Sequence, residues 1–335
     1  MKKRICMFAA FMLALSLVLC GCGGFSDVGD GTSATGEAPT SRAAESSGAA
    51  VPDTTGDTSV AADTTTVETP PETPPETTEE WVSEYDGRFG SAGKLAGNTV
   101  IVSIYTTDAG TSWGAEDAEL IDETLRYLGI AAAWLSRNAY DYGTQADFIY
   151  DWSADPELRL DAMFDVSLVR QESDFYDLQA DYVRENVDSE GLCRKYRADN
   201  IIYFFFFNTG FENTVRPWTV GGTFGGDLYV EYTNLYVKFN DVTSPPSTYA
   251  HEILHTYGAP DLYYASPAIP QEYVDLCTAN GSNDIMYTVY LGDEITNELS
   301  PLIAYYVGIA PRPLMADTWG FPHSAHEGDG EIVYG

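Results

Sequence analysis

Basic residues are scarce in this sequence, and their scarcity excludes whole classes of partner. The chain has 335 residues, in which 17 Lys and Arg stand against 51 Asp and Glu, for a formal net charge of −34. A protein that neutralises nucleic-acid phosphates needs clustered Lys and Arg, so we exclude a nucleic-acid partner. The same charge argues against electrostatic docking on anionic lipid. It is compatible with a secreted or surface protein, and with one that attracts cations.

Several motifs are missing as well. The sequence has no phosphate-binding glycine loop, no Ser or Cys in a nucleophile elbow and no EF-hand spacing. A structural Ca²⁺ site among the many acidic residues therefore has no motif to support it.

Cysteine is rare, with five in the chain and no CxxC spacing that would indicate a thiolate metal cluster. Cys6, Cys20 and Cys22 belong to the N-terminal signal region described next. Cys193 and Cys277 lie in the region that we expect to fold. They either form one disulfide, which an extracytoplasmic site permits, or remain two buried thiols.

A long apolar run lies at the N-terminus. Basic residues at 2–4 precede an apolar segment at 5–20, which has the length of a secretory signal core and is short for a membrane span. Its end, Leu-Cys-Gly-Cys at 19–22, resembles a bacterial lipoprotein signal. By that resemblance residues 1–21 are a signal peptide and Cys22 becomes the lipidated first residue. The alternatives are Cys20, which the large Leu19 before the cut disfavours, and an ordinary signal peptide. We expect an extracytoplasmic protein at the bacterial cell surface, anchored to the membrane by this lipid alone.

The next segment, 22–80, is rich in Thr, Pro, Glu and other small or polar residues and has no apolar periodicity. Such a segment cannot bury enough surface to offset its ordering entropy, so we predict a disordered tether. Trp81 marks a change to aromatic and β-branched runs that continue to the end. We expect one domain over 81–335, which also carries most of the negative charge.

Apolar patterns within this domain predict an α/β (α+β) fold. Strands are expected at 98–106, 146–152 and 200–208, and helices at 116–137 and 174–187. After a glycine-rich segment at 221–226, two alternating runs, 227–232 and 234–239, are expected to pair as a hairpin. This order favours helices packed on a twisted mixed sheet with one antiparallel edge strand.

The chemistry-bearing residues lie at 251–261, which read HEILHTYGAPD after the helix-start signal Ser-Pro-Pro-Ser at 244–247. His251 and His255 are four residues apart, so both project from one helix face and can each bind one Zn²⁺ at about 2.0–2.1 Å. Glu252 can reach a metal-bound water without being a ligand and can take its proton, while zinc lowers the pKa of that water and polarises a scissile carbonyl. The alternative is a helix whose two histidines are ordinary surface or core residues.

The end of this predicted helix supplies a third ligand. Gly258 can end the helix in a left-handed turn, and Pro260 blocks its continuation. Asp261 then lies one short turn beyond the helix, where its carboxylate can swing back toward the histidines.

The pattern HExxHxxGxxD with a downstream Met resembles the metzincin clan of zinc endopeptidases, and HEILHTYGAPDLY is most similar to the immune inhibitor A-like peptidases. The candidate Met-turn is 283–287, in which Met286 would form a floor beneath the zinc without binding it. The resemblance implies a metzincin-like catalytic domain: the sheet comes first, its antiparallel edge strand binds substrate backbone and the active-site helix follows. A C-terminal helix at 300–308 closes the lower subdomain.

The chain departs from the clan at two places. Most metzincins have a third His where this chain has Asp261; some branches have Asp, so Asp261 stays our third ligand, with a distant carboxylate or one of the late histidines, His323 and His326, as alternatives. Several metzincins have a Tyr two residues after the Met, where this chain has Thr288. The neighbouring Tyr287 and Tyr290 are candidates for oxyanion support, with packing as the alternative role.

Together these features predict a lipid-anchored zinc metalloendopeptidase, a monomer that hydrolyses polypeptide substrates with one catalytic Zn²⁺ and Glu252 as general base. One alternative is a catalytically silent binding or adhesion protein on a metallopeptidase-like scaffold. Another is a zinc enzyme that acts on a non-peptide amide.

Overall fold

The computed structural model describes residues 92–167, 175–224 and 228–327, except for the side chains of residue 175 and of 220–224 and 228–231. Contacts divide the chain into Met1–Pro74 and Pro75–Gly335, and all the described residues lie in the second unit. The predicted signal peptide, the lipidation site Cys22 and the tether lie outside the described residues, as does the proposed domain start at Trp81.

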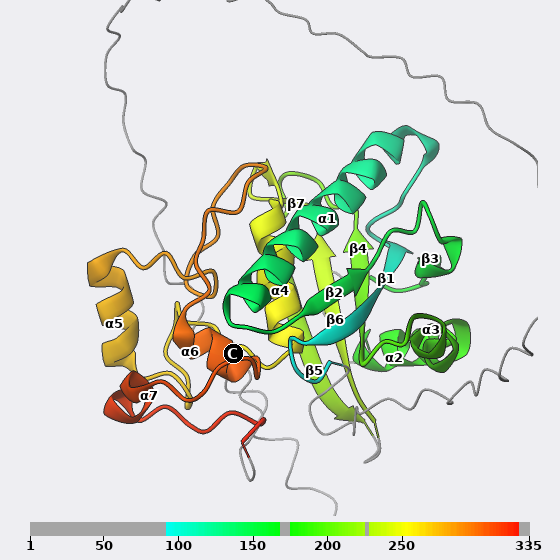
Figure 1. The fold of residues 1–335 in the computed structure, drawn as a ribbon. Helices are drawn as coiled ribbons and strands as arrows, with labels where there is room; N and C mark the ends of the chain where they lie inside the picture. The colour runs from blue at the N-terminus through cyan, green and yellow to red at the C-terminus, as the bar shows by residue number, and fades with distance from the viewer. Residues whose placement is uncertain (1–91, 168–174, 225–227, 328–335) are drawn as a thin grey trace, which may run out of the picture. The chain divides into compact units, whose positions relative to one another are not determined.

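A mixed sheet forms the centre of the described region (Figure 1). Its strands run in the order β2-β1-β4-β6-β5, and β3 also pairs with β1. The bounds are Gly97–Thr107 for β1, Ala146–Ile149 for β2, Arg159–Met163 for β3, Asn200–Phe207 for β4, Trp218–Phe224 for β5 and Leu228–Tyr236 for β6. All pairings are parallel except that of β5 with β6. The predicted mixed sheet with one antiparallel edge strand is therefore confirmed.

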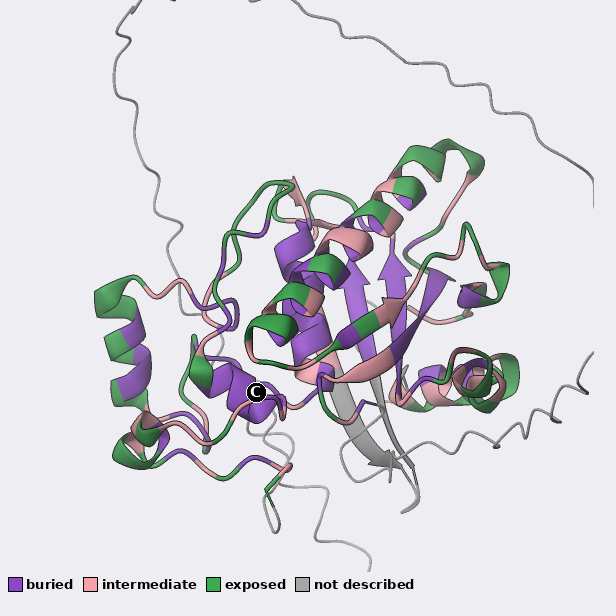
Figure 2. Ribbon diagram, viewed as in Figure 1, coloured by how far each residue is buried: buried purple, intermediate pink, exposed green. Residues whose placement is uncertain are grey.

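The two central strands separate two hydrophobic clusters because successive side chains of a strand point to opposite faces. Every residue of β4 is buried. Its Ile202, Phe204 and Phe206 belong to one cluster, together with residues of α1 (Ala118–Asp141) and α4 (Pro246–Thr256). Alternate β4 residues belong to the other cluster, with residues of α2 (Phe175–Asn186) and α3 (Ser189–Tyr196). Helices thus cover both faces of the sheet, and Figure 2 shows the buried strands between them.

The expected hairpin between 227–232 and 234–239 is wrong. Most of those residues form one continuous strand, β6, which pairs with the glycine-containing strand β5. Thr233, where the turn was expected, is a fully buried β-branched residue that pairs with Thr219. A β-branched side chain suits a pleated strand and not a tight turn, which explains the error.

The C-terminal part of the described region contains helices α5 (Gln271–Asn280), α6 (Pro301–Tyr306) and α7 (Leu314–Trp319). Only α6 was expected, at 300–308; it begins where the Ser300 side chain accepts a hydrogen bond from the Ile303 amide at 3.3 Å. The strand β7 (Lys238–Phe239) lies at the end of the run expected at 234–239. Short elements that sequence patterns did not indicate include the strand β8 (Val242–Thr243) and the single turns η1 (Ala115–Asp117) and η2 (Pro156–Leu158).

Cys193 and Cys277 are free thiols, so the disulfide alternative is wrong. Cys193 on α3 packs at the edge of one hydrophobic cluster, whereas Cys277 on α5 lies in the other, across the sheet. The sheet between them prevents the short Cα separation that a disulfide needs. A separate observation concerns helix length: within the described ranges, none of the helices has both the length and the apolar character of a membrane span.

Candidate metal centre

Helix α4 carries the histidine pair and is buried over almost its whole length (Figure 2). Pro245 is its N-cap residue and Pro246 its first helical residue, where the missing amide hydrogen of proline leaves no donor unpaired. No side chain caps the helix, and the hydroxyl of Ser244, the first residue of the helix-start signal, instead donates to the Tyr236 carbonyl at 2.7 Å. Ser247 donates to the Tyr290 carbonyl at 2.9 Å, which ties the first turn of α4 to the loop after Met286.

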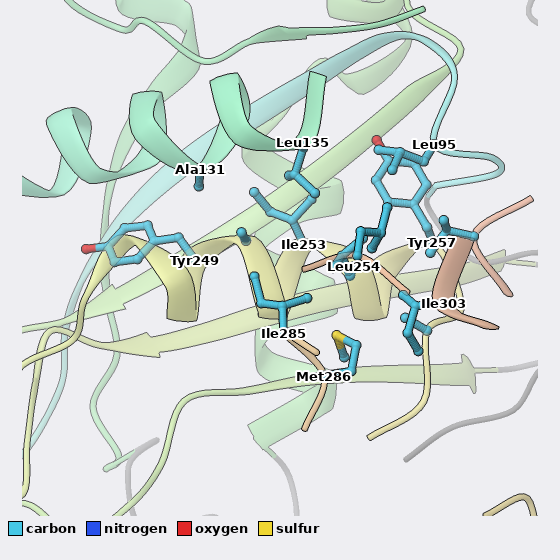
Figure 3. Packing of buried hydrophobic residues seen from close by; sticks show 14 of the residues in the cluster. Leu95, Ala131, Leu135, Tyr249, Ile253, Leu254, Tyr257, Ile285, Met286 and Ile303 are labelled. Carbon is cyan, nitrogen blue, oxygen red and sulfur yellow. The ribbon is translucent and has the colours of Figure 1, made fainter. Parts of the chain in front are cut away.

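Two layers hold α4 in place (Figure 3). Ala131 and Leu135 of α1 lie on one side of the helix, and Ile285 and Met286 lie on the other. All four side chains are fully buried. Packing on both sides fixes the helix against rotation, so the direction of its polar side chains is also fixed.

The helix ends as its sequence predicts. The Gly258 amide donates to the His255 carbonyl at 2.8 Å, and Gly258 has a φ of +92°, which strongly favours glycine. The Ala259 amide then donates to the Leu254 carbonyl at 3.1 Å. This turn sends the chain back along α4, so that Asp261 faces the histidines.

His251, His255 and Asp261 form one compact cluster, and it is the only group with possible metal-ligand geometry found among the described residues. The two Nε2 atoms are 3.1 Å apart. Asp261 Oδ1 lies 3.1 Å from Nε2 of His251 and 3.3 Å from Nε2 of His255. Tetrahedral Zn²⁺ with ligands at 2.0–2.1 Å sets those ligands about 3.3 Å apart, so the donor set matches the size of this ion.

Hydrogen bonds on the far side of each ring fix which nitrogen faces the cluster. Nδ1 of His251 lies 2.9 Å from the Ile285 carbonyl, and Nδ1 of His255 lies 2.8 Å from the Ala259 carbonyl. A carbonyl only accepts, so each Nδ1 carries a hydrogen, and each ring in its neutral form presents an Nε2 lone pair to the cluster. Asp261 Oδ1 is buried and has no hydrogen-bond partner within the described part of the chain. Three lone-pair donors thus converge on one point, which is stable only around positive charge.

The electrostatics of the cluster agree with this requirement. Burial would lower the pKa of the His255 imidazole, but the Asp261 carboxylate and Glu252 outweigh it and raise that pKa to about 9. Burial would likewise raise the pKa of Asp261, but the two imidazoles hold it well below its usual range. The cluster therefore favours a bound cation or proton at its centre.

Glu252 lies beside the cluster and is 3% exposed. Burial raises the pKa of its carboxyl group, against the opposing effects of the two histidines and of Thr219. Thr219 of β5 donates to Glu252 Oε2 at 2.8 Å. The carboxylate is therefore held close to the donor set without being part of it.

The turn that contains Met286 connects the ligand-bearing segments. Asp284 Oδ1 accepts from the Met286 amide at 2.7 Å, and the Asp284 carbonyl accepts from the Tyr287 amide at 3.0 Å. The Leu262 amide, next to Asp261, donates to the Met286 carbonyl at 2.9 Å. Because the Ile285 carbonyl also accepts the hydrogen bond from His251 Nδ1, this turn supports both the helix and the segment after it.

The remaining candidates are Tyr287 and Tyr290, which follow Met286, and the late histidines His323 and His326. The Tyr287 hydroxyl donates to Thr278 Oγ1 at 3.0 Å, and Tyr290 is 42% exposed. His323 Nδ1 lies 2.9 Å from Glu327 Oε2, and His326 Nε2 lies 3.3 Å from the Tyr257 carbonyl. Neither late histidine belongs to the cluster with His251 and His255.

Sequence patterns missed two residues at the centre. The Tyr263 ring stacks on the His251 ring, with centroids 6.3 Å apart and planes at 25°, and burial together with the nearby Asp261 and Glu252 carboxylates raises the pKa of its hydroxyl. Its position two residues after Asp261 was an available signal. Thr219 had no such signal, because it lies on a strand 33 residues before Glu252.

Compared with models of protein families and with curated proteins, the chain gives no match. The functional conclusion therefore rests on the chemistry of the cluster and of Glu252.

Proposed function

We propose that this protein is a zinc metalloendopeptidase with a metzincin-like catalytic domain, lipid-anchored on the outer side of the membrane. One observation carries the proposal: the donor atoms of His251, His255 and Asp261 lie 3.1–3.3 Å from one another. Beside them lies the buried carboxylate of Glu252, which is not one of the donors. This combination of a cation site and an adjacent base is what metal-assisted hydrolysis requires.

The proposed roles follow from the contacts. His251, His255 and Asp261 would hold Zn²⁺, which supplies a water of lowered pKa and polarises the substrate carbonyl. Glu252 takes a proton from the attacking water and later delivers it to the leaving amine. Met286 lies beneath the helix as an apolar floor, and its turn orients His251 through the Ile285 carbonyl.

A polypeptide substrate is supported by the position of β5. This strand is the antiparallel edge of the sheet, and it contacts Glu252 through Thr219. An edge strand presents unpaired backbone groups that an extended peptide can join by β-augmentation. The acidic domain would favour basic or neutral peptides over acidic ones.

The test is cleavage of an unfolded polypeptide by the purified full-length chain, with chelator, after zinc is restored, and in the Glu252→Gln variant. We expect chelator to abolish cleavage and Glu252→Gln to lower it by about 10³-fold while zinc content stays the same. Glu190→Gln is the matched control, because Glu190 is an exposed residue on α3, on the other face of the sheet.

Bound zinc without Glu252-dependent cleavage would refute the peptidase proposal. That outcome would favour a silent binding or adhesion protein on the same scaffold. Glu252-dependent hydrolysis of small amides but not of polypeptides would favour the non-peptide alternative.

A further inference from the structure

Thr219 links the edge strand to the proposed general base. It is the second residue of β5 and pairs with Thr233 of β6. Its Oγ1 atom lies 2.8 Å from Glu252 Oε2, 3.0 Å from the Glu252 carbonyl oxygen and 3.0 Å from Thr233 Oγ1. The Thr219 hydroxyl is thus within hydrogen-bond distance of both the carboxylate and the backbone carbonyl of the buried Glu252.

The direction of these bonds follows from the number of hydrogens. A hydroxyl has one hydrogen to donate and two lone pairs. The carbonyl of Glu252 and its ionised carboxylate only accept, so the Thr219 hydrogen is directed to Glu252. Thr233, which is fully buried, then donates its own hydrogen to Thr219. Of the two acceptors on Glu252, Oε2 is the nearer, and Thr219 needs only its own hydrogen to bind it, so this bond does not require the one from Thr233.

A glutamate carboxylate needs such a partner because its last torsion angle has a broad, two-fold distribution and does not orient itself. We infer that Thr219 is a positioning residue for Glu252: it holds Oε2, so that Oε1 is the oxygen that takes the proton of water. This inference rests on the proposed function. If the proton is accepted at Oε1, Oε2 keeps its bond from Thr219 both before and after the transfer.

A merely structural role for Thr219 makes a different prediction. In that case its side chain would only support the pairing of β5 with β6, which Thr233 supports equally from the partner strand. Thr→Val substitution at either position keeps the size and branching of the side chain and removes the hydroxyl. Thr233→Val is therefore a matched control, since Thr233 touches Thr219 and not the carboxylate.

The first experiment measures peptide cleavage by the full-length zinc-loaded chain. We expect Thr219→Val to lower kcat by about 10- to 100-fold and to change KM by less than about threefold. The expected loss is a part of the 10²- to 10⁴-fold rate increase that a general base contributes in total. Thr219→Ser keeps the hydroxyl and should restore kcat to within about threefold. Thr233→Val should leave kcat within about threefold of wild type, and zinc content should be the same in all variants.

The second experiment needs no activity. The melting temperature of the full-length chain is measured with chelator for Thr219→Val, Glu252→Ala and the double variant. We expect Thr219→Val to lower the melting temperature more in the wild-type background than in Glu252→Ala, because only the former leaves a buried carboxylate oxygen without its donor.

The outcomes separate the two hypotheses. If the wild type cleaves through Glu252 but Thr219→Val keeps full kcat, or loses no more than Thr233→Val, the inference is overturned and the peptidase proposal stands. Equal melting shifts in both backgrounds would also overturn the inference. If the wild type cleaves nothing, the peptidase proposal fails, and the role of Thr219 fails with it.

Discussion

Asp284 is expected to make the protein less stable as the pH rises. It is 6% exposed, its Oδ1 accepts from the Met286 amide at 2.7 Å, and its Oδ2 accepts from the Ser300 amide at 3.3 Å. Burial nevertheless raises its pKa from 3.8 to about 6, against the hydrogen bonds from Ser300 and Met286. The folded state therefore holds this proton more tightly than the unfolded state does.

The size and sign of the effect follow from linkage. Where the folded state binds more protons, the free energy of unfolding falls as pH rises. A pKa shift of this size changes the free energy of unfolding by ~3 kcal/mol in total, at 1.36 kcal/mol per pH unit. About 2 kcal/mol of this loss of stability occurs between pH 4.5 and pH 7. Well above the pKa of Asp284 in the folded state the loss of stability is complete, and the free energy of unfolding no longer changes with pH through this group.

Asp284→Asn removes this titration. Asn keeps one acceptor oxygen but turns an NH₂ group toward the second amide, which costs about 1–3 kcal/mol at every pH. The free energy of unfolding is measured with urea from pH 4.5 to pH 7 for both chains, with chelator present so that metal binding adds no pH dependence of its own. From pH 4.5 to pH 7 the free energy of unfolding of the variant should rise by about 2 kcal/mol relative to that of the wild type. A difference that stays constant within about 0.5 kcal/mol would refute the reasoning, because it would mean that burial does not raise the pKa of Asp284.

Three further predictions concern the metal centre and its support. Asp261→Asn removes the charged ligand and should weaken zinc binding by about 100-fold or more, whereas His323→Ala should leave the affinity unchanged. Zinc affinity is measured at pH 7 by competition with a chromophoric chelator. Tyr263→Ala removes the ring that stacks on His251 and should weaken zinc binding by about 10-fold, with Tyr264→Ala as the control; equal affinities in the two variants would contradict an orienting role of the Tyr263 ring. Met286→Leu should cost less than about 1.5 kcal/mol of unfolding free energy and Met286→Ala about 2–5 kcal/mol, with zinc content unchanged in both, and loss of zinc from the leucine variant would show that the methionine is more than an apolar floor.

Local sequence patterns predicted the elements on which the candidate site stands. The apolar run at 200–208 predicted a strand, and β4 lies there with every residue buried. The four-residue spacing of His251 and His255 placed both rings on one helix face, and Gly258 marked the end of that helix. These features depend on the periodicity of a single helix or strand, or on the backbone freedom of one residue, and both are visible in a short stretch of sequence.

The register between distant segments was beyond those patterns. Only the pairing of β5 with β6 brings Thr219 to Glu252, and only packing against α1 and the Met286 turn fixes the direction of the two histidines. The sequence by itself thus determined which residue types stand at which helical and strand positions. The tertiary structure alone decided that Asp261 Oδ1 lies 3.1 Å and 3.3 Å from the two Nε2 atoms and that Cys193 and Cys277 form no disulfide. The physical reason is that each such contact depends on how separate helices and strands pack together, and no local periodicity encodes that packing.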